Sequence, residues 1–353
     1  MPLRPGPALP HPRPPDDHIR HALLTEIHTY FTAPWHLIED QAGTRLDITW
    51  REAPSPRHPA RRPLDNSEIL TRIETTFAER GITRGRVLPI RWGRDTDLTI
   101  SAVQALDPYL KDGRPFTYSQ GLIPQPVVRF TGKRDEAGRL RPGFLTSFVN
   151  LSCVVPITEV GEHLQLIDTW ISALSRLGLH ARHLRFHGTH NIWTRQNVRG
   201  ITLRFTYANT TIADAVLLWN TSHPRHMASD IGSGLERLRW IQTGHNWSEA
   251  AFGDHAGDWP PQLLDAIRTA TLLIDGGIRP GTRGPSRALN RVLDQIPRQI
   301  ATAGLSRLVR DAYTHWGQVT QLRTPWPVTS QMIEEAAIMR TASTERGRKD
   351  HIA

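Results

Sequence analysis

Apolar residues recur along most of the chain at spacings of a helix or a strand, which predicts a mixed α and β structure. The segment GEHLQLIDTWISALSRLGL is strongly amphipathic at helical spacing and ends near Gly178. EILTRIETTFAERG predicts another helix, capped by Asn66 or Ser67 and closed by Gly81. After MASDIG, the segment SGLERLRWIQTG predicts a further helix, and residues 245–353 show only helical patterns.

Segments with strand spacing or many β-branched residues lie between and after the first helices. They are LDITWRE, RVLPIRW, DLTISAVQAL, PQPVVRFTG, FLTSFVNLSCVVPI, ARHLRFH, GITLRFTYA and AVLLWNTS. Strands mixed with helices and followed by a purely helical run predict an α+β domain joined to an all-α domain.

The amino-terminal part differs from the rest in its proline content. Residues 1–66 hold twelve of the 27 prolines, which favours extended ends around a short helix in HIRHALLTEIHTYF. A small accessory element over residues 18–52 is therefore expected. The predicted division is an extension over 1–66, a first domain over 67–244 and a helical domain over 245–353.

The composition adds limits on partners and location. The net charge of +9 is compatible with a nucleic-acid partner, although nearly all of it is arginine and an arginine-rich coding bias gives the same value. No apolar run is long enough for a membrane span, and no secretory signal is found. One cysteine, Cys153, excludes an internal disulfide framework and a multi-cysteine zinc site. We expect a cytoplasmic protein without membrane or DNA partners.

The most informative segment is SDIGSGLERL, residues 229–238. Gly232 and Gly234 let the backbone approach a ligand, and Arg237 on the following helix can stack on a purine or pair with a phosphate. A tight turn between a strand and a helix is the alternative for the two glycines alone.

The string DxGxGLERL resembles motif 3 of the class II aminoacyl-tRNA synthetases, and its leading Asp resembles the alanyl-tRNA synthetases. The resemblance implies a class II antiparallel sheet flanked by helices. It implies that Gly232, Gly234, Glu236 and Arg237 contribute to an ATP site and that Asp230 holds the amino group of the amino acid.

Two upstream segments extend the resemblance. Gln125–Arg129 resembles the start of motif 2, which implies that Arg129 faces the α-phosphate, where its charge would stabilise the adenylate-forming transition state. Taken alone, Arg129 is also compatible with an ordinary surface arginine. Phe148 is then the candidate surface for adenine. The stretch GFLTSFVNLSCVV lacks the histidine pair and the acid that the family carries there.

The resemblance covers roughly residues 67–300 and implies further site residues. HNIW resembles the segment that brings a tryptophan to the alanine pocket, so Trp193 is a candidate wall, with a core aromatic as the alternative. Asp214 lies where the family often has a carboxylate near the metal and the amino acid. The segment after residue 262 resembles the start of the helical tRNA-recognition domain. Candidate contacts for a tRNA acceptor stem are Arg283, Arg287 and Arg291.

The resemblance therefore implies an alanyl-tRNA synthetase-like enzyme that uses ATP and Mg²⁺ to activate an amino acid, with alanine as the candidate, as an adenylate. Transfer to tRNA or to another acceptor would follow. The alternative is a non-catalytic module derived from a synthetase that binds tRNA or a protein. The length leaves no room for the family's editing domain. Four histidines at 180, 183, 187 and 190 match no metal motif, and neither GxSxG nor GxxxxGK[ST] occurs.

Overall fold

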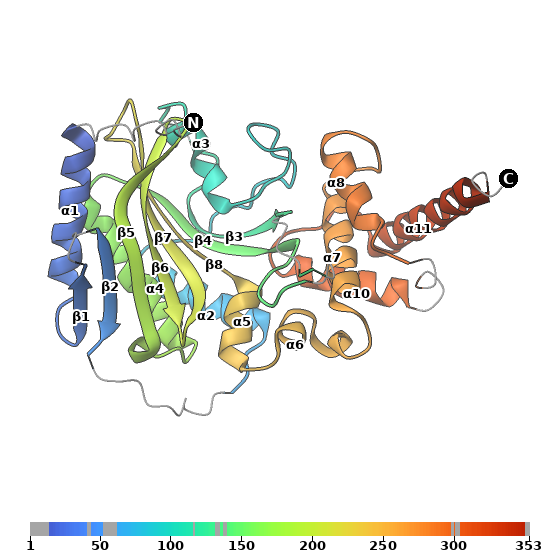
Figure 1. The fold of residues 1–353 in the computed structure, drawn as a ribbon, viewed down its shortest axis with the longest axis horizontal. Helices are drawn as coiled ribbons and strands as arrows, with labels where there is room; N and C mark the ends of the chain where they lie inside the picture. Colours follow the sequence, from blue (N-terminus) through green and yellow to red (C-terminus); the bar gives the residue numbers. More distant parts are fainter. Residues whose placement is uncertain are drawn as a thin grey trace, which may run out of the picture.

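The computed structural model describes residues 14–40, 44–51, 62–115, 117–130, 135–136, 140–297, 300 and 304–349. An antiparallel sheet of eight strands forms its centre, in the order β1-β2-β5-β6-β7-β8-β4-β3 (Figure 1). The strands are β1 (Trp35–Glu39), β2 (Arg45–Trp50), β3 (Gly121–Val128), β4 (Ser147–Ile157), β5 (Leu184–Arg195), β6 (Val198–Tyr207), β7 (Thr210–Asn220) and β8 (Met227–Gly234). The predicted α+β class and the antiparallel sheet are confirmed.

Helices precede, connect and follow these strands (Figure 1). They are α1 (Pro14–Tyr30), α2 (Asn66–Ala78), η1 (Ala102–Leu106), α3 (Asp107–Leu110), α4 (Val160–Arg176), η2 (Ala181–His183), α5 (Leu235–Thr243), α6 (Trp247–Phe252), η3 (Gly253–Ala256), α7 (Pro261–Asp275), α8 (Gly284–Leu293), α10 (Leu305–Gly317) and α11 (Trp326–Lys349). Among them, α2, α4, α5 and α7 confirm predicted helices.

The two faces of the sheet differ because strand side chains alternate in direction. On β7, Ala213, Ala215 and Leu217 are buried, whereas Asp214 and Val216 point to the opposite, more open face. The buried face carries the main core, and α1, α2, α4 and α5 cover it. On the opposite face, η1 and α3 cover a smaller apolar cluster that includes Val154 and Leu218. The rest of this face carries polar side chains and borders the cavities described below.

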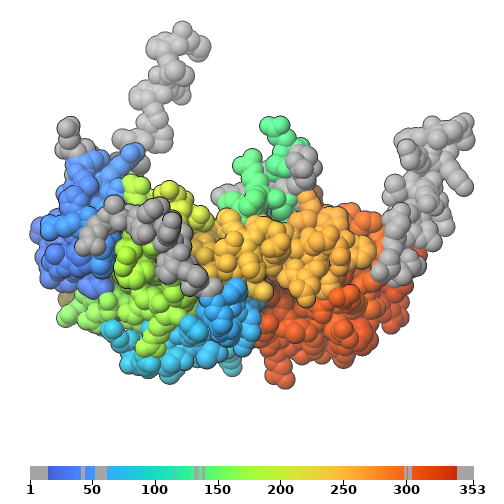
Figure 2. All heavy atoms as spheres, turned by 90° about the horizontal axis from the view of Figure 1, so that it is seen from below, coloured from blue at the N-terminus to red at the C-terminus, as the bar shows by residue number. Residues whose placement is uncertain are grey.

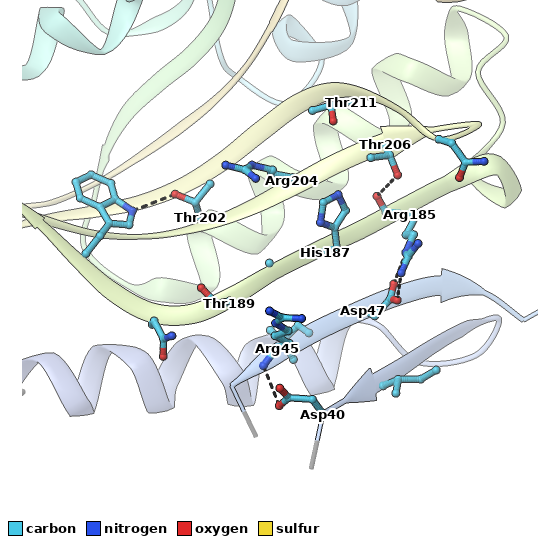
Figure 3. Close-up of a pocket in the computed structure, with 16 residues that line it drawn as sticks. Asp40, Arg45, Asp47, Arg185, His187, Thr189, Thr202, Arg204, Thr206 and Thr211 are labelled. Carbon is cyan, nitrogen blue, oxygen red and sulfur yellow. Dashed lines mark hydrogen bonds and ion pairs between the residues drawn. The ribbon is translucent and has the colours of Figure 1, made fainter. Parts of the chain in front are cut away.

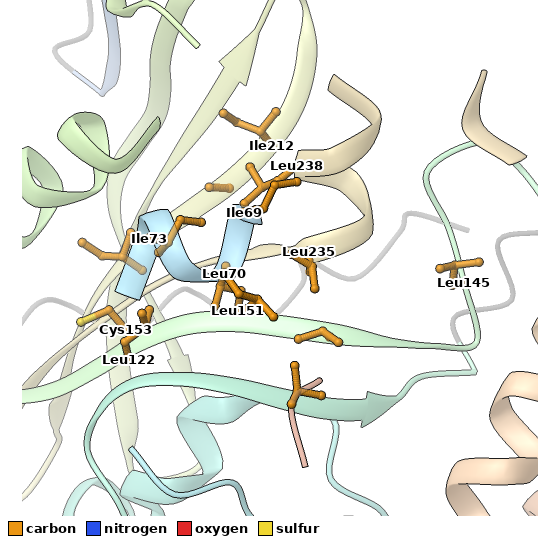
Figure 4. Packing of buried hydrophobic residues seen from close by; sticks show 14 of the residues in the cluster. Ile69, Leu70, Ile73, Leu122, Leu145, Leu151, Cys153, Ile212, Leu235 and Leu238 are labelled. Carbon is orange, nitrogen blue, oxygen red and sulfur yellow. The ribbon is translucent and has the colours of Figure 1, made fainter. Parts of the chain in front are cut away.

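In the core beneath the sheet, buried side chains of α2 pack against buried side chains of β4. Ile69 and Ile73 of α2 lie beside Leu151 and Cys153 of β4, and all four are fully buried (Figure 4). Complete burial of an aliphatic side chain of this size stabilises a fold by about 1.5–3 kcal/mol. This packing fixes β4, and with it the strand end that carries Phe148.

The two amino-terminal strands belong to the central sheet, and the amino-terminal helix packs against it. β1 pairs with β2, and β2 pairs with β5 through partners such as Ile48 and Phe186. Asp16 at the start of α1 accepts a 2.8 Å hydrogen bond from Trp219 Nε1 and pairs with Arg199. The segment expected to form a small accessory element thus holds α1, β1 and β2, and its two strands lengthen the central sheet.

The helices after β8 pack against one another and against the end of the sheet. Asp265 on α7 accepts a 2.9 Å hydrogen bond from the Thr146 amide, and Thr269 lies 2.7 Å from the Ser147 hydroxyl. No strand follows Gly234 in the described part of the chain. The amino-terminal element and the late helices lie at opposite ends of an elongated molecule (Figure 2). None of the described helices is both long and apolar enough for a membrane crossing.

Three local predictions are wrong. The segments RVLPIRW and DLTISAVQAL form no strands beyond isolated bridges, and the second contains η1. Some of their backbone amides donate to glutamine side chains. The Leu88 amide donates to Gln125, and the Ile100 amide donates to Gln104. The cap of α2 is Asp65, whose carboxylate accepts from the Glu68 amide at 2.8 Å.

Candidate functional site

A cavity of about 550 Å³ opens on the polar face where β4, β7 and β8 meet the start of α5. Three adjacent strands supply its floor because Asp214 pairs with Gly232, and Gly232 pairs with Ser152. The structure brings most of the predicted site residues into this one space. Those that line it are Arg129, Phe148, Asp214, Asp230, Gly232, Gly234, Glu236 and Arg237.

Asp230 lies on the floor of the cavity, one strand from Ser152. The Ser152 hydroxyl donates a hydrogen bond to the Asp230 carboxylate. Burial raises the pKa of Asp230 to about 6, while Ser152 and the charge of Arg129 act in the opposite direction. A carboxylate in this position is suited to a cationic partner, because an ammonium group would replace the water that burial has removed.

The two glycines lie at different distances from neighbouring side chains. A Cβ on Gly232 would lie 2.5 Å from the Ser152 hydroxyl, so the Ser152–Asp230 hydrogen bond requires a glycine here. A Cβ on Gly234 would lie 3.6 Å from the Phe148 ring and 3.7 Å from the Arg237 Cβ. These are ordinary van der Waals distances, so the packing around Gly234 would admit a Cβ, whereas that around Gly232 would not.

Arg129 follows β3 and reaches the cavity from the side of Phe148. Its Nε donates to the carbonyl of Ile100, and its guanidinium lies 5.1 Å from the centre of the Phe148 ring. Burial lowers the pKa of Arg129, and the carboxylates of Asp230 and Asp214 oppose that change. An arginine remains charged in either case, so the cavity holds a fixed cation.

Arg237 occupies the first turn of α5 and lies across the cavity mouth. It donates to the carbonyls of Gly143 at 2.6 Å and Thr211 at 3.2 Å, and its guanidinium lies 5.6 Å from the centre of the Phe144 ring. Burial lowers its pKa and Asp214 raises it. These contacts tie the segment before β4 to the strand β7, and they place a second cation at the cavity.

Glu236 precedes Arg237 but is buried between the sheet and the late helices. Its side chain is only 2% exposed, and its two carboxylate oxygens accept from the Val149 amide at 3.3 and 3.2 Å. His315 Nε2 on α10 lies 3.2 Å away, and Arg268 on α7 lies 4.0 Å away. Glu236 borders the cavity, but its carboxylate holds the sheet, α5 and the late helices together.

Asp214 stands beside Arg204 at the open edge of the cavity. The Arg204 Nε lies 3.7 Å from the Asp214 carboxylate, and both side chains are more than half exposed. The surrounding strands remove part of the bulk water and raise the pKa of Asp214, against the charges of Arg204 and Arg237. Arg204 and Thr211 also line a second, larger cavity on the same face.

Trp193 lies in that second cavity, away from Asp230. Its indole covers Gly200 and donates a 3.1 Å hydrogen bond to the Thr202 hydroxyl. Thr202 pairs with Val216, which pairs with Asp230, so Thr202 is two strands or about 10 Å from Asp230. The structure does not bring Trp193 and Asp230 into one cavity.

The arginines of the late helices lie on the other side of Arg129. A cavity of about 720 Å³ between the end of β3 and α8 contains Arg287 and Arg291 together with Arg129. The Arg291 guanidinium lies 4.6 Å from the centre of the Phe130 ring. Arg283 precedes α8 and is not part of this cavity. Lys133 and Arg134 fall outside the described residues.

Several cavity residues were not predicted from the sequence. Phe148, Asn150 and Ser152 face the same side of β4 because they are two residues apart, so alternation alone could have added the last two to Phe148. Asn150 accepts from the Ala102 amide at 2.9 Å, which holds η1 against the cavity wall. Arg204 carries no recognisable motif, and only the cross-strand pairing with Asp214 places it in the site.

The fold and the cavity together define an α+β protein with an open polar site on an antiparallel sheet. No protein-family model matches the sequence, and a search of curated proteins finds no significant match.

Proposed function

We propose that this protein binds ATP in the cavity between β4, β8 and α5 and joins an amino acid to AMP as an aminoacyl-adenylate. The observation that carries the proposal is the convergence of Arg129, Arg237, Phe148 and Asp230 on one cavity from separate segments of the chain. The class II synthetase resemblance of the sequence implies the same residues in the same roles.

The chemistry requires stabilisation of negative charge on the α-phosphate when the amino acid carboxylate attacks it. Arg129 is held by its bond to Ile100 and by the Phe148 ring, so its charge needs little reorganisation during the reaction. Phe148 and Arg237 both line the cavity, and a purine ring could stack on either side chain. Asp230 would hold the ammonium group of the amino acid.

Mg²⁺ is the implied metal, and the residues of the cavity fit it. Protein sites for Mg²⁺ commonly use one or two carboxylates together with phosphates of the substrate. Asp214 offers such a carboxylate at the cavity edge, although the described residues contain no group of three metal ligands. When bound, the ion would neutralise phosphate charge.

The resemblance also implies tRNA as the acceptor of the aminoacyl group. Arg287 and Arg291 are the candidate contacts, since their cavity shares Arg129 with the proposed nucleotide site. Alanine as the amino acid likewise rests on the resemblance, whereas Trp193, its candidate wall, lies in the second cavity.

Amino-acid-dependent exchange between ATP and pyrophosphate tests adenylate formation. We expect exchange with one or a few amino acids, and a loss of about 10²–10³-fold in Arg237→Ala, by comparison with the removal of a donor that stabilises developing charge. Arg225→Ala, which removes an exposed arginine on the loop before β8, should retain exchange. Far-UV circular dichroism would establish that each variant is folded.

An absence of exchange would contradict adenylate formation. If ATP binds but no proteinogenic amino acid supports exchange, the protein does not form adenylates. Specific tRNA binding without exchange would then favour the non-catalytic module.

A further inference from the structure

A second cavity of about 1040 Å³ lies beside the proposed nucleotide site on the same face of the sheet (Figure 3). Strands β5 and β6 form its floor, and the amino-terminal hairpin forms one side through Ile38, Asp40, Arg45 and Asp47. The class II resemblance covers none of these four residues. The cavity therefore exists in this form because β1 and β2 extend the sheet.

The charges that line the second cavity are nearly balanced. Arg45, Arg185 and Arg204 face Asp40 and Asp47, and Asp214 adds a carboxylate beside Arg204. Arg185 is already neutralised, because its guanidinium makes two hydrogen bonds to the Asp47 carboxylate (Figure 3). A path for a nucleic acid needs an excess of cations along it. This lining instead suits a small molecule that carries both a positive and a negative group.

The two cavities are neighbours, because Arg204 and Thr211 line both of them. A straight row of paired residues crosses from one to the other, from Arg45 through Thr189, Thr202 and Val216 to Asp230. Four strand spacings separate its ends, which is about 19 Å. A ligand that spans this distance has a length of a few extended residues, at about 3.5 Å each.

We propose that the second cavity binds a zwitterionic amine, either a free amino acid or a short peptide, as the acceptor of the activated aminoacyl group. This inference rests on the proposed adenylate formation. Arg45 binds the acceptor carboxylate at the far end, and the acceptor ammonium lies toward Asp214, beside Arg204. The exposed indole of Trp193 provides a surface for the acceptor side chain.

The transfer forms an amide and releases AMP. The acceptor enters as an ammonium and loses one proton to solvent, which frees the nitrogen lone pair. That nitrogen bonds to the adenylate carbonyl carbon, the bond from this carbon to the phosphate oxygen breaks, and AMP leaves with the electron pair. A second proton passes from the nitrogen to solvent.

The test measures AMP release by the full-length chain with ATP and the amino acid identified by exchange. Free amino acids and diglycine serve as acceptor probes, and mass spectrometry identifies a product equal to both reactants less one water. We expect stimulated AMP release in the wild type and a loss of about tenfold or more in Arg45→Ala, because a charge-assisted hydrogen bond contributes about 1.5–3 kcal/mol. Thr189→Trp, which fills the middle of the cavity, should have the same effect.

Both variants should keep pyrophosphate exchange, since neither residue lines the nucleotide cavity. Arg51→Ala is the matched control, because Arg51 is exposed beyond the end of β2 and does not line the second cavity. Exchange without stimulation by any zwitterion overturns the inference and leaves adenylate formation intact. Stimulation by tRNA alone, reduced in Thr189→Trp, would make the cavity an RNA path and also overturn it.

If exchange itself is absent, adenylate formation fails and the cavity is tested by binding alone. Saturation-transfer NMR with diglycine should then show binding to the wild type that Thr189→Trp removes. Absence of that binding overturns the zwitterion site as well.

Discussion

For Asp230, the sequence predicted the residue and its proposed partner but not its surroundings in the fold. The sequence indicated a carboxylate next to a glycine-rich turn, and the resemblance gave it an ammonium partner. Its burial, its bond to Ser152 and its distance from Trp193 depend on strand pairing, which no local pattern specifies. The residue type was predictable, and its surroundings were not.

The raised pKa of Asp230 predicts a stability gain when its charge is removed. The folded protein binds the proton near pH 6 and the unfolded chain near 3.8, so the ionised carboxylate destabilises the fold at neutral pH. Asp230→Asn should therefore increase the free energy of unfolding at neutral pH by about 1–3 kcal/mol, since one pKa unit corresponds to about 1.4 kcal/mol. Thermal or urea unfolding measures the change.

The gain should disappear below pH of about 4, where Asp230 is protonated in both states. Under the proposed function, the same variant should lose pyrophosphate exchange. Asp258→Asn, at an exposed position, should change stability by less than about 0.5 kcal/mol. A variant no more stable than the wild type at neutral pH would show that Asp230 is well solvated.

At the scale of elements, periodicity predicted the long helices and most strands of the sheet. It missed β8, because SDIGSG contains glycine and serine in place of β-branched residues. Hydrogen bonds from β4 on one side and β7 on the other impose the extended conformation there. Similarly, RVLPIRW looks like a strand, but the Gln125 side chain satisfies the Leu88 backbone that a neighbouring strand would otherwise pair.

The close approach of β4 and β8 predicts a steric effect at Gly232. Gly232→Ala places a Cβ 2.5 Å from the Ser152 hydroxyl and 2.8 Å from its Cβ, so one of the two strands must shift. We expect a loss of about 1–3 kcal/mol in the free energy of unfolding, as for other overpacked sites. Chemical denaturation of the purified variant provides the measurement.

A second substitution isolates the cause. Gly232→Ala combined with Ser152→Gly removes the obstructing side chain, so the double variant should recover part of the lost stability. Gly257→Ala is the matched control, because nothing lies within 4 Å of its Cβ position and its φ is −85°. Equal losses in the single and double variants would indicate that the backbone, and not Ser152, is obstructed.

At the scale of the whole molecule, the sheet and the late helices meet around Glu236. The resemblance to motif 3 assigned Glu236 to a nucleotide site. In the structure its carboxylate lies beside Val149 of β4, Arg268 of α7 and His315 of α10. A contact between segments so far apart in the sequence depends on the assembled fold.

The buried histidines predict how the whole molecule responds to acid. Burial, helped by the charge of Arg268, lowers the pKa of His315 to about 4, and burial lowers that of His163 to about 3. In the unfolded chain a histidine binds a proton near pH 6.5, whereas these two bind it in the folded protein only near pH 4 and pH 3. The free energy of unfolding therefore falls as the pH is lowered from about 6.5 to these values. For His315 the loss is about 3 kcal/mol, at about 1.4 kcal/mol per unit.

His315→Gln should therefore reduce the dependence of unfolding free energy on pH between about 6.5 and 4. Asp230 opposes the histidines in the lower part of this window, because its protonation near pH 6 favours the folded state. Because both proteins share the other titrating groups, the variant should lose about 3 kcal/mol less than the wild type across this window. Urea titrations at several pH values measure both slopes, with exposed His245→Gln as the control. Parallel slopes for wild type and His315→Gln would mean that His315 is protonated as readily in the folded protein as in the unfolded chain.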